Sequence, residues 1–489
     1  MITEHKIQIS NLKPYTKYYY CIGDTKDTLA GVDTSHYFVT APVKGTEMPI
    51  RIWALGDAGY AIADQRNVRN AYYKYIGSKH TNFWLILGDN AYSDGKDDEY
   101  QIGMFENMFE NMLAKSSVWA TPGNHDIRKY RDLPYTAPYY SIYDMPQKAE
   151  CGGIASNNPG YYSFDYGNVH VISLETNHTP RYDTSAMAEW LKKDLAANKS
   201  RWTLAFMHHP PYSKGSHNAD DTTGEDLRCT ETRKYLVPIL EKGGVDFVIT
   251  GHSHVYERSY MIHGQYDSSG TFLDEPHIVN AQISGRRDSN EVYVKNPKDQ
   301  NYPNYGTVYN VMGCSGFIES TIYWVKQPNN LITNSMMYTY SNKNLGSMLI
   351  EVNKDTLTAR FIDKNAIVRD YYTIIKDETK QITLIKAKLN KDLHVGISEN
   401  QSENHTKLSI YPNPAINKLS IDYNVEHKEK VVIEILNTQG NVVNTVLNQT
   451  QSAGQYSAEI SCNDMPNGVY VVSVKIGRNV TTKQLVIKE

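Results

Sequence analysis

Five short segments of the chain place polar and ionisable side chains directly after apolar runs: GDAG, GDNAY, GNH, MHHP and GHSH. An Asp in such a position often only caps a helix, and a His-His pair before Pro is usually part of a loop. Capping does not require a His after Gly, however, or an Asn-His pair after Gly. All five segments together therefore predict a shared metal site. The residues that could form it are Asp57, Asp89, Tyr92, Asn124, His125, His208, His209, His252 and His254.

The side-chain types narrow the choice of metal. Imidazole, carboxylate, amide and phenol ligands without a thiolate suit Fe, Zn or Mn rather than Cu(I) or an iron–sulfur cluster. The phenolate of Tyr92 is a hard anionic donor and favours Fe(III). One carboxylate can bridge two metal ions, and ions about 3.5–4 Å apart hold both the attacking and the leaving oxygen of a displacement at phosphorus. The segments thus indicate a two-metal site suited to phosphate esters.

The candidate residues follow strands that alternate with helices. Strands are expected within 49–59, 82–90, 117–126, 168–176, 201–211 and 245–254. Helical spacing is present in 63–80, 97–115, 185–200 and 230–244. This alternation predicts an α/β layered fold, in which functional groups gather beyond the carboxyl ends of the strands.

Residues 1–42 differ from the rest, with strands expected at 5–10, 17–23 and 35–42. In LKPYTKYYY a Pro-led turn precedes a strand Tyr, which resembles a corner of fibronectin type III and related sandwiches. Only the last strands of such a sandwich are present. We therefore expect a partial fibronectin III-like stub that packs on the next domain or that lacks its N-terminal part.

The sequence predicts that the C-terminal part of the chain is a separate module. Residues 378–405 are polar and weakly patterned, which predicts a linker. Residues 406–489 contain runs that alternate with period two, which predicts a small Ig-like β-sandwich. IYPNP, NGVY and the terminal TKQLVIKE resemble the type A sorting domain of type IX secretion. That resemblance implies export by the type IX secretion machinery, so the protein is expected to be secreted or held at the cell surface.

Composition excludes several classes of protein. The 489 residues are 40% hydrophobic and 21% charged, with a net charge of -4, which favours neither nucleic-acid binding nor a membrane surface. No stretch approaches a membrane span. The five Cys form no CxxC pair, which argues against a thiolate zinc site. The start, MITEHKIQIS, lacks the apolar core of a signal peptide, so for an exported protein we expect a truncated N-terminus.

In their order, GDAG, GDNAY, GNH, MHHP and GHSHVYERS resemble the five blocks of the purple acid phosphatases, within the calcineurin-like metallophosphoesterases. YYSFDYGNVHVISLET also resembles the family. The resemblance covers residues 50–377 and implies a β-sandwich flanked by helices, in four αββα layers. It also implies a binuclear acid phosphatase that hydrolyses phosphate monoesters by attack of a metal-bound hydroxide. The N-terminal stub fits the fibronectin-like domain of the longer members.

The resemblance also implies a role for each residue. Asp57, Tyr92 and His254 would hold Fe(III), and Asp89 would bridge the two ions. A divalent ion (Zn, Mn or Fe) would be held by Asn124, His208 and His252. Phosphate binding or proton donation would fall to His125, although Asp126 stands where members often carry Glu. His217, in YSKGSHN, is the general-acid candidate and would bind substrate with Asn124 and His125. His209 is expected not to be a ligand, and Glu257 and Arg258 are expected to be structural.

Two other functions remain open from the sequence. A phosphodiesterase or nucleotidase could use the same scaffold, because loops set the choice of substrate; Tyr92 favours the purple acid phosphatase branch. A surface adhesion protein with a decayed hydrolase domain is the third hypothesis. Against it, none of the five blocks has lost its ligand.

Overall fold

The computed structural model describes residues 5–271, 277–279, 283–319, 337–341, 343–380, 408–413, 415–425, 427–437, 442–462, 465–477 and 479–488. They belong to two compact units, Met1–Ala387 and Lys388–Glu489, and each is considered by itself. The predicted linker at 378–405 lies outside the described residues from position 381 onward. Among the described residues, no helix combines the length and apolar character of a membrane span.

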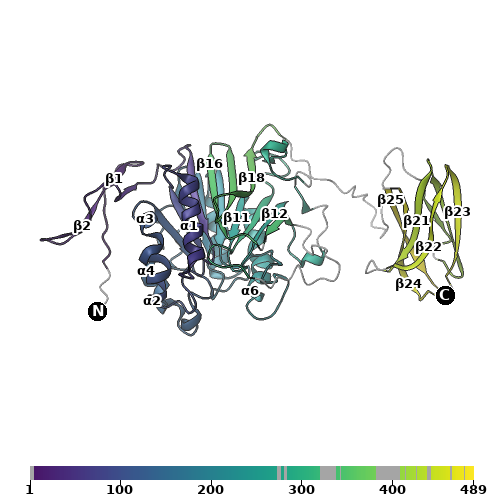
Figure 1. The fold of residues 1–489 in the computed structure, drawn as a ribbon, viewed down its shortest axis with the longest axis horizontal. Helices are drawn as coiled ribbons and strands as arrows, with labels where there is room; N and C mark the ends of the chain where they lie inside the picture. The colour runs from purple at the N-terminus through teal and green to yellow at the C-terminus, as the bar shows by residue number, and fades with distance from the viewer. Residues whose placement is uncertain are drawn as a thin grey trace. The chain divides into compact units, whose positions relative to one another are not determined.

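Two mixed sheets form the core of the first unit (Figure 1). The strands of one sheet are β5 (Ile50–Leu55), β6 (Phe83–Leu87), β7 (Ser117–Thr121), β13 (Tyr293–Lys295), β16 (Gly346–Asn353), β17 (Thr356–Asp363) and β18 (Val368–Lys376). Those of the other are β8 (Tyr162–Tyr166), β9 (Val169–Leu174), β10 (Trp202–Met207), β11 (Phe247–Thr250), β12 (Tyr256–Ile262), β14 (Thr307–Met312) and β15 (Met337–Ser341). The orders are β13-β18-β17-β16-β5-β6-β7 and β15-β12-β14-β11-β10-β9-β8. The predicted α/β class is confirmed.

Parallel strands make up the part of each sheet that leads to the candidate site. β5, β6 and β7 are parallel neighbours in the first sheet. β9, β10, β11 and β14 are parallel neighbours in the second. Apart from Arg51 of β5 and the first three residues of β7, the residues of these strands are buried, as expected for parallel strands covered on both faces.

The helices lie between these strands in the sequence. They are α1 (Ala63–Ile76), α2 (Asp97–Tyr100), η1 (Gln101–Phe109), α3 (Glu110–Leu113), α4 (Pro138–Ile142), α5 (Ala186–Ala197), α6 (Leu227–Glu231), η4 (Thr232–Leu236) and α7 (Val237–Lys242), with short 3₁₀ turns η2 (Arg128–Tyr130), η3 (Pro134–Thr136), η5 (Ser269–Thr271) and η6 (Arg287–Ser289). The helices expected at 97–115 and 230–244 each contain a π-helical stretch, η1 and η4, which the spacing of apolar residues did not reveal.

Aromatic side chains fix the helices on the first sheet. Trp53 of β5 stacks on Tyr72 of α1 with ring centroids 4.3 Å apart. Trp84 of β6 packs against Phe109 of η1 at 5.3 Å. Both tryptophans therefore face away from the second sheet, while Phe83, one residue earlier, faces Phe164 of β8 at 5.4 Å. This is the alternation expected of a strand buried on both faces.

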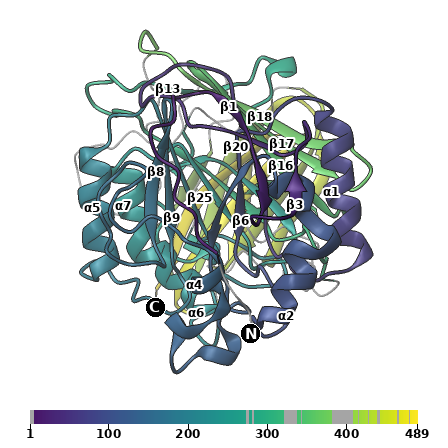
Figure 2. The same ribbon diagram turned by 90° about the vertical axis from the view of Figure 1, so that its left-hand side faces the viewer.

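The outer face of the second sheet is covered in the same way. Ile172 of β9 belongs to one apolar cluster with Leu191 of α5 and Leu240 of α7. Figure 2 shows α1 on one side of the sheets and α5 and α7 on the opposite side. Helices thus cover the outer face of each sheet, and the inner faces share the larger core.

The N-terminal strands form two short antiparallel pairs. β1 (Lys17–Tyr19) pairs with β4 (Tyr37–Val39), and β2 (Cys21–Gly23) pairs with β3 (Thr28–Gly31). The strand expected at 5–10 is wrong: these residues are exposed and pair with no strand. The apolar residues that alternate in this segment have no neighbouring sheet among the described residues against which they could be buried. β3 was missed because it is short and follows a polar turn. The Tyr20 hydroxyl donates to the Ala114 carbonyl oxygen (3.0 Å), which ties this region to the end of α3.

The strands that the structure describes in the second unit pair with their neighbours in an antiparallel way. They are β19 (Ser409–Tyr411), β20 (Lys418–Val425), β21 (Glu429–Leu436), β22 (Val442–Gln451), β23 (Gly454–Ser461), β24 (Gly468–Ile476) and β25 (Asn479–Ile487). The sheets have the orders β19-β20-β23 and β22-β21-β24-β25. Every second residue of β20 is buried, and these residues share one core with those of β21 and β24. The predicted all-β module is confirmed.

A buried ion pair joins the two sheets of the first unit. Arg258 of β12 donates to both carboxylate oxygens of Asp370 of β18, at 2.6 and 3.1 Å, and both side chains are almost fully buried. The Tyr256 hydroxyl donates to the same carboxylate. Glu257 is buried beside Ser213, whose hydroxyl it accepts at 2.5 Å, and burial raises the pKa of Glu257 to about 7. These contacts link elements of the fold, as expected if Glu257 and Arg258 are structural residues.

We expect Asp370→Ala to lower the free energy of unfolding by about 3–5 kcal/mol, because it removes the carboxylate that pairs with the buried Arg258 guanidinium. All six Trp lie within Met1–Ala387, so tryptophan fluorescence during denaturant unfolding reports on this unit. Glu189→Ala, which removes an exposed pair with Lys192, is the matched control and should cause no measurable change. An equally small effect of both substitutions would show that the buried pair of Arg258 and Asp370 does not stabilise this unit.

Candidate metal centre

The five predicted segments all lie at the ends of strands. In the first sheet, Asp57 follows β5, Asp89 follows β6 and Asn124 follows β7. In the second sheet, His208 follows β10 and His252 follows β11. The segments therefore come from two different sheets, and their side chains meet beyond the carboxyl ends of the strands.

The backbone at this edge is strained at three of the candidate ligands. Asp57, Asp89 and His252 have positive φ angles of 55°, 53° and 66°. Such conformations cost about 1–3 kcal/mol each for non-glycine residues and gather at functional sites. The surrounding sheets hold the three side chains where an unstrained turn would not place them.

Two glycines allow the ligand loops to approach each other. A Cβ atom on Gly123 would lie 2.1 Å from Asp89 Oδ1, and one on Gly251 would lie 2.4 Å from Asp57 Oδ2. Atoms that close overlap, so only glycine fits. The Gly that precedes the Asn in GNH and the His in GHSH is therefore required by close packing against a carboxylate.

We expect Gly123→Ala to abolish metal binding and to lower activity on the order of 10²-fold or more, because the Cβ displaces the Asp89 carboxylate. Elemental analysis of the purified variant measures the first effect. Gly77→Ala is the control: Gly77 has φ 62° and open space around its Cβ position, so it adds backbone strain away from the site. Unchanged metal content in Gly123→Ala would contradict the close packing of Gly123 against the Asp89 carboxylate.

The first cluster surrounds the hydroxyl of Tyr92. Its oxygen lies 2.8 Å from Asp89 Oδ2, 3.2 Å from Asp57 Oδ1 and 3.3 Å from His254 Nε2. A phenol has one hydrogen, so Tyr92 can donate to only one of the two carboxylates. Burial and then the charges of Asp89 and Asp57 raise the pKa of Tyr92 well above its ordinary value. Buried carboxylates that converge on a phenol in this way fit a bound cation.

The second cluster surrounds the amide oxygen of Asn124. His208 Nε2 lies 2.9 Å and His252 Nδ1 lies 3.1 Å from Asn124 Oδ1. The Asn124 amide nitrogen donates to Glu225 Oε2 (3.3 Å), and this acceptor fixes which end of the amide faces the histidines. His208 Nδ1 faces the Leu87 carbonyl oxygen at 2.9 Å, so that nitrogen carries the hydrogen.

The tautomer of His208 has a direct consequence for the second cluster. With its hydrogen on Nδ1, His208 presents a lone pair on Nε2 to an amide oxygen that also has only lone pairs. Two acceptors at hydrogen-bond distance require a positive charge between them, either a proton or a metal ion. Amide and imidazole donors fit a borderline divalent ion.

Asp89 lies between the two clusters. Its Oδ2 accepts from Tyr92, while its Oδ1 lies 3.5 Å from His208 Nε2 and accepts the backbone N–H of His125 at 2.9 Å. Burial opposes ionisation of Asp89, but its interactions with the His208 and His125 imidazoles outweigh burial and lower its pKa. Ligand atoms of Asp57, Asp89 and His208 all lie within 4.8 Å of one another. One carboxylate therefore reaches both clusters.

His125 is held by the backbone rather than by Asp126. Its Nδ1 lies 2.7 Å from the Ser93 carbonyl oxygen, and its ring lies 4.5 Å from that of Tyr92. The Asp126 carboxylate instead accepts from the backbone N–H groups of Asn90 (2.9 Å) and Gly123 (2.7 Å). Asp126 therefore joins the Asp89 and Asn124 loops.

His217 and His209 lie on either side of His252. The His217 ring stacks on the His252 ring with centroids 3.7 Å apart, and His217 Nδ1 lies 2.6 Å from Asp226 Oδ1. The His209 ring lies 4.5 Å from that of His252, and its Nδ1 faces the Thr176 hydroxyl at 3.0 Å. Burial lowers the pKa of His209 well below its usual value, which keeps this ring neutral.

The sequence analysis did not identify three residues that lie near the site. Glu225 orients Asn124, Asp226 contacts His217, and the Tyr60 ring stacks on Tyr92 at 3.8 Å. In the sequence GED ends four residues before an expected helix, and acidic residues are common near the start of a helix. Tyr60 is one of 38 tyrosines and carries no positional signal.

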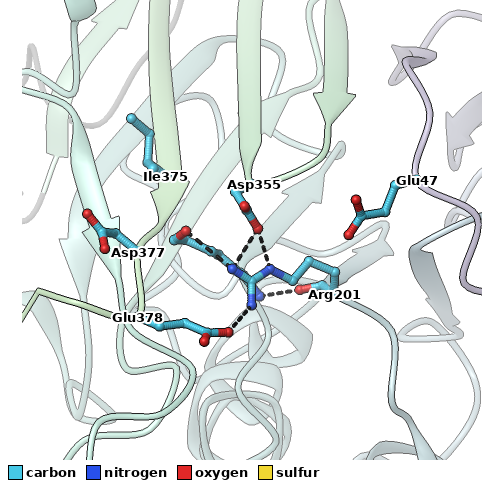
Figure 3. Close-up of a pocket in the computed structure, with 7 residues that line it drawn as sticks. Glu47, Arg201, Asp355, Ile375, Asp377 and Glu378 are labelled. Atoms are coloured by element: carbon cyan, nitrogen blue, oxygen red, sulfur yellow. Dashed lines mark hydrogen bonds and ion pairs between the residues drawn. The ribbon is translucent and has the colours of Figure 1, made fainter.

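A pocket elsewhere in the first unit shares no residue with the candidate centre. It has a volume of about 600 Å³ and is lined by Glu47, Arg201, Asp355, Asp377 and Glu378, among others (Figure 3). Arg201 pairs with Asp355 at 2.6 Å and with Glu378 at 2.9 Å. Arg201 is therefore held between two of the carboxylates that line the pocket, as in a structural ion-pair network.

Comparison with known families gives two matches. The family model described as calcineurin-like phosphoesterase matches residues 50–256, a range that contains all seven expected metal ligands. The model described as secretion system C-terminal sorting domain matches residues 409–488. The two matches fall in the two compact units described above.

Curated relatives are similar to the first unit. Purple acid phosphatase 21 of Arabidopsis thaliana is 29% identical over 266 residues, which is 53% of this chain and 54% of the relative. A purple acid phosphatase of Glycine max is 28% identical over 271 residues, 53% of each protein. Acid phosphatase type 7 of Mus musculus is 26% identical over 287 residues, 56% of this chain and 60% of the relative. The chain thus spans about half the length of the curated relatives it matches.

Among solved structures, a purple acid phosphatase from yellow lupin seeds aligns with a TM-score of 0.54 and 18% identity. The alignment covers 75% of this chain and 61% of the lupin chain. At this identity the likeness concerns the fold alone.

Proposed function

Since the chain is a calcineurin-like metallophosphoesterase related to the purple acid phosphatases, with a C-terminal type IX secretion sorting domain, we propose that it is a binuclear acid phosphatase that hydrolyses phosphate monoesters. The sorting domain indicates that the protein is secreted or lies at the cell surface. Its His and Asp groups form the metal-binding part of the site.

One observation carries the proposal: Asp89 is shared by two clusters of converging acceptors. The first cluster has a phenol and two carboxylates, and the second has an amide oxygen and two imidazoles. Hard anionic donors suit Fe(III), whereas the neutral donors suit Zn, Mn or Fe(II). A carboxylate between two such clusters is the ligand arrangement of a two-metal hydrolase.

Each metal position has its own set of residues in this proposal. Asp57, Tyr92 and His254 would hold Fe(III), and Asn124, His208 and His252 would hold the divalent ion, with Asp89 common to both. When bound, the two ions supply Lewis-acid activation of water and of the phosphoryl oxygens. The chain's contribution is to fix the ligands, through the strained turns at Asp57, Asp89 and His252.

The proton required by the reaction falls to a histidine. Hydrolysis joins a water oxygen to phosphorus and breaks the bond from phosphorus to the ester oxygen, which leaves with a proton. His217 and His125 are the candidate donors, and both lie beside the clusters: His217 against His252, and His125 against Tyr92. With Asn124 they would also bind the phosphate.

The finer domain assignments belong to the same proposal. We assign a fibronectin III-like stub to residues 1–42, the catalytic domain to 50–377, a linker to 378–405 and an Ig-like sorting domain to 406–489. The antiparallel N-terminal pairs and the two C-terminal antiparallel sheets support these assignments. The partners expected from them are a phosphate ester and the type IX secretion machinery, which either releases the protein or leaves it attached to the surface.

The test is hydrolysis by the full chain after incubation with Fe(III) and Zn²⁺. We expect 4-nitrophenyl phosphate to be hydrolysed at mildly acidic pH, and bis(4-nitrophenyl) phosphate at least about 10-fold more slowly in kcat/KM. Removal of the metals with a chelator should abolish both activities, and their return should restore them. A clear preference for the diester would replace the monoesterase with the phosphodiesterase alternative.

A further inference from the structure

Asp226 lies where its carboxylate can control the orientation of His217. We propose that Asp226 is a positioning residue that fixes the ring and the tautomer of His217, so that Nε2 is the nitrogen presented to the leaving group. The inference rests on the proposed function, in which His217 donates a proton to the ester oxygen.

The contact between the two side chains is short and directional. His217 Nδ1 lies 2.6 Å from Asp226 Oδ1. An ionised carboxylate only accepts hydrogen bonds, so His217 must carry a hydrogen on Nδ1. That leaves Nε2 as the nitrogen free to face a substrate, and it removes the alternative ring orientation in which Nδ1 would face outward.

Asp226 is itself held in place for this role. It is almost fully buried, and its Oδ2 accepts the backbone N–H of Asn218 at 2.9 Å. It occupies the position before the first residue of α6, where an Asp side chain normally caps the helix, yet it makes no capping hydrogen bond. The carboxylate is turned toward His217 instead of toward its own helix.

The surroundings restrict His217 from the other directions. Its ring stacks on His252 with an interplanar angle of 26°, and its backbone N–H donates to the Ser253 hydroxyl at 3.3 Å. Glu225, the neighbour of Asp226, holds Asn124. The adjacent pair Glu225–Asp226 thus fixes two groups on the same side of the site, one a proposed metal ligand and the other a proposed proton donor.

A carboxylate is the only group of this size that serves both partners of Asp226. In Asp226→Asn one of the two oxygens becomes an NH₂ group. That group must face either the His217 Nδ1–H or the Asn218 N–H, and either arrangement opposes two donors. His217 is then expected to change tautomer or to rotate, and the proton donor is lost while the protein remains folded.

The kinetic test compares two monoesters with different needs for protonation. The 4-nitrophenolate ion leaves readily without a proton, whereas the alkoxide of glycerol 2-phosphate requires one. We expect Asp226→Asn to lower kcat about 10²-fold for glycerol 2-phosphate and less than about 10-fold for 4-nitrophenyl phosphate. Metal content should stay at the wild-type value.

The matched control is Asp220→Asn. Asp220 is a half-buried carboxylate on the same loop, and it pairs with Lys214 and Arg233 rather than with His217. It should change both esters by the same factor. Two results would overturn the inference. One is an equal loss of activity for both esters in Asp226→Asn. The other is loss of the divalent metal in that variant, which would show that Asp226 instead positions His252, whose Nε2 lies 3.7 Å from Asp226 Oδ1.

A second readout does not depend on catalysis. Long-range ¹H–¹⁵N spectra of the full chain, labelled at histidine and loaded with diamagnetic Zn²⁺, report which ring nitrogen carries hydrogen; His217→Gln assigns the signal. We expect the Nδ1–H form in the wild type and a changed form in Asp226→Asn. If the wild type shows hydrogen on Nε2 alone, the inference fails, whereas an inactive enzyme with the Nδ1–H form would remove only the proposed function.

Discussion

Asp89→Asn is expected to abolish phosphomonoester hydrolysis, with a fall in kcat/KM on the order of 10³-fold or more, while the protein stays folded. Asp89 Oδ2 faces Tyr92 and Oδ1 faces His208, so one carboxylate serves both clusters. Asn keeps the shape of the side chain and tolerates the left-handed backbone at this position. It removes the charge and turns one ligand oxygen into a donor.

The measurement is metal content together with steady-state kinetics of the purified variant. Both metals should be lost or weakly bound, because each cluster loses a shared anionic ligand. Asp94→Asn, five residues along the same loop, alters a partly exposed ion pair with Lys96 and should keep activity and metals. A variant at Asp89 that retains two tightly bound ions would show that this carboxylate does not bridge them.

Tyr92→Phe is expected to remove the visible colour of the iron-loaded protein completely. The colour is attributed to charge transfer from the phenolate to Fe(III), which requires the hydroxyl oxygen. Without a cation, burial and the neighbouring carboxylates hold the pKa of Tyr92 far above neutral pH, so the phenolate forms only when a metal ion replaces its proton. The ring contacts of Tyr92 with Tyr60 and His125 are kept by Phe, and the fold should be unchanged.

Tyr60→Phe is the control for this experiment, since its ring stacks on Tyr92 at 3.8 Å. It should keep the violet colour. The visible spectrum and circular dichroism of both variants distinguish the effects. Colour that persists in Tyr92→Phe would exclude Tyr92 as an iron ligand.

Much of the site could be predicted because it lies at strand ends. A buried strand followed by Gly and a polar residue is a local pattern, and Asp57, Asp89, Asn124, His208 and His252 all occupy it. The requirement for glycine is also local in sequence, although its cause is distant: Gly123 is forced by Asp89, which lies in another loop.

Contacts between loops that are distant in the sequence could not be predicted from such local patterns. Glu225 and Asp226 follow no strand, and acidic residues before a helix are common, so nothing distinguished them from caps. The split of the five segments between two sheets, and the π-helical stretches η1 and η4, depend on packing across the core. The expected strand at 5–10 failed because alternation predicts a strand only where a partner strand is present.

A two-metal site with Tyr92 on iron can be tested by metal analysis and a visible spectrum of one protein sample after incubation with Fe(III) and Zn²⁺. We expect two metal ions per chain, one of them iron, and a violet absorption band. A colourless protein that binds neither metal would contradict this expectation.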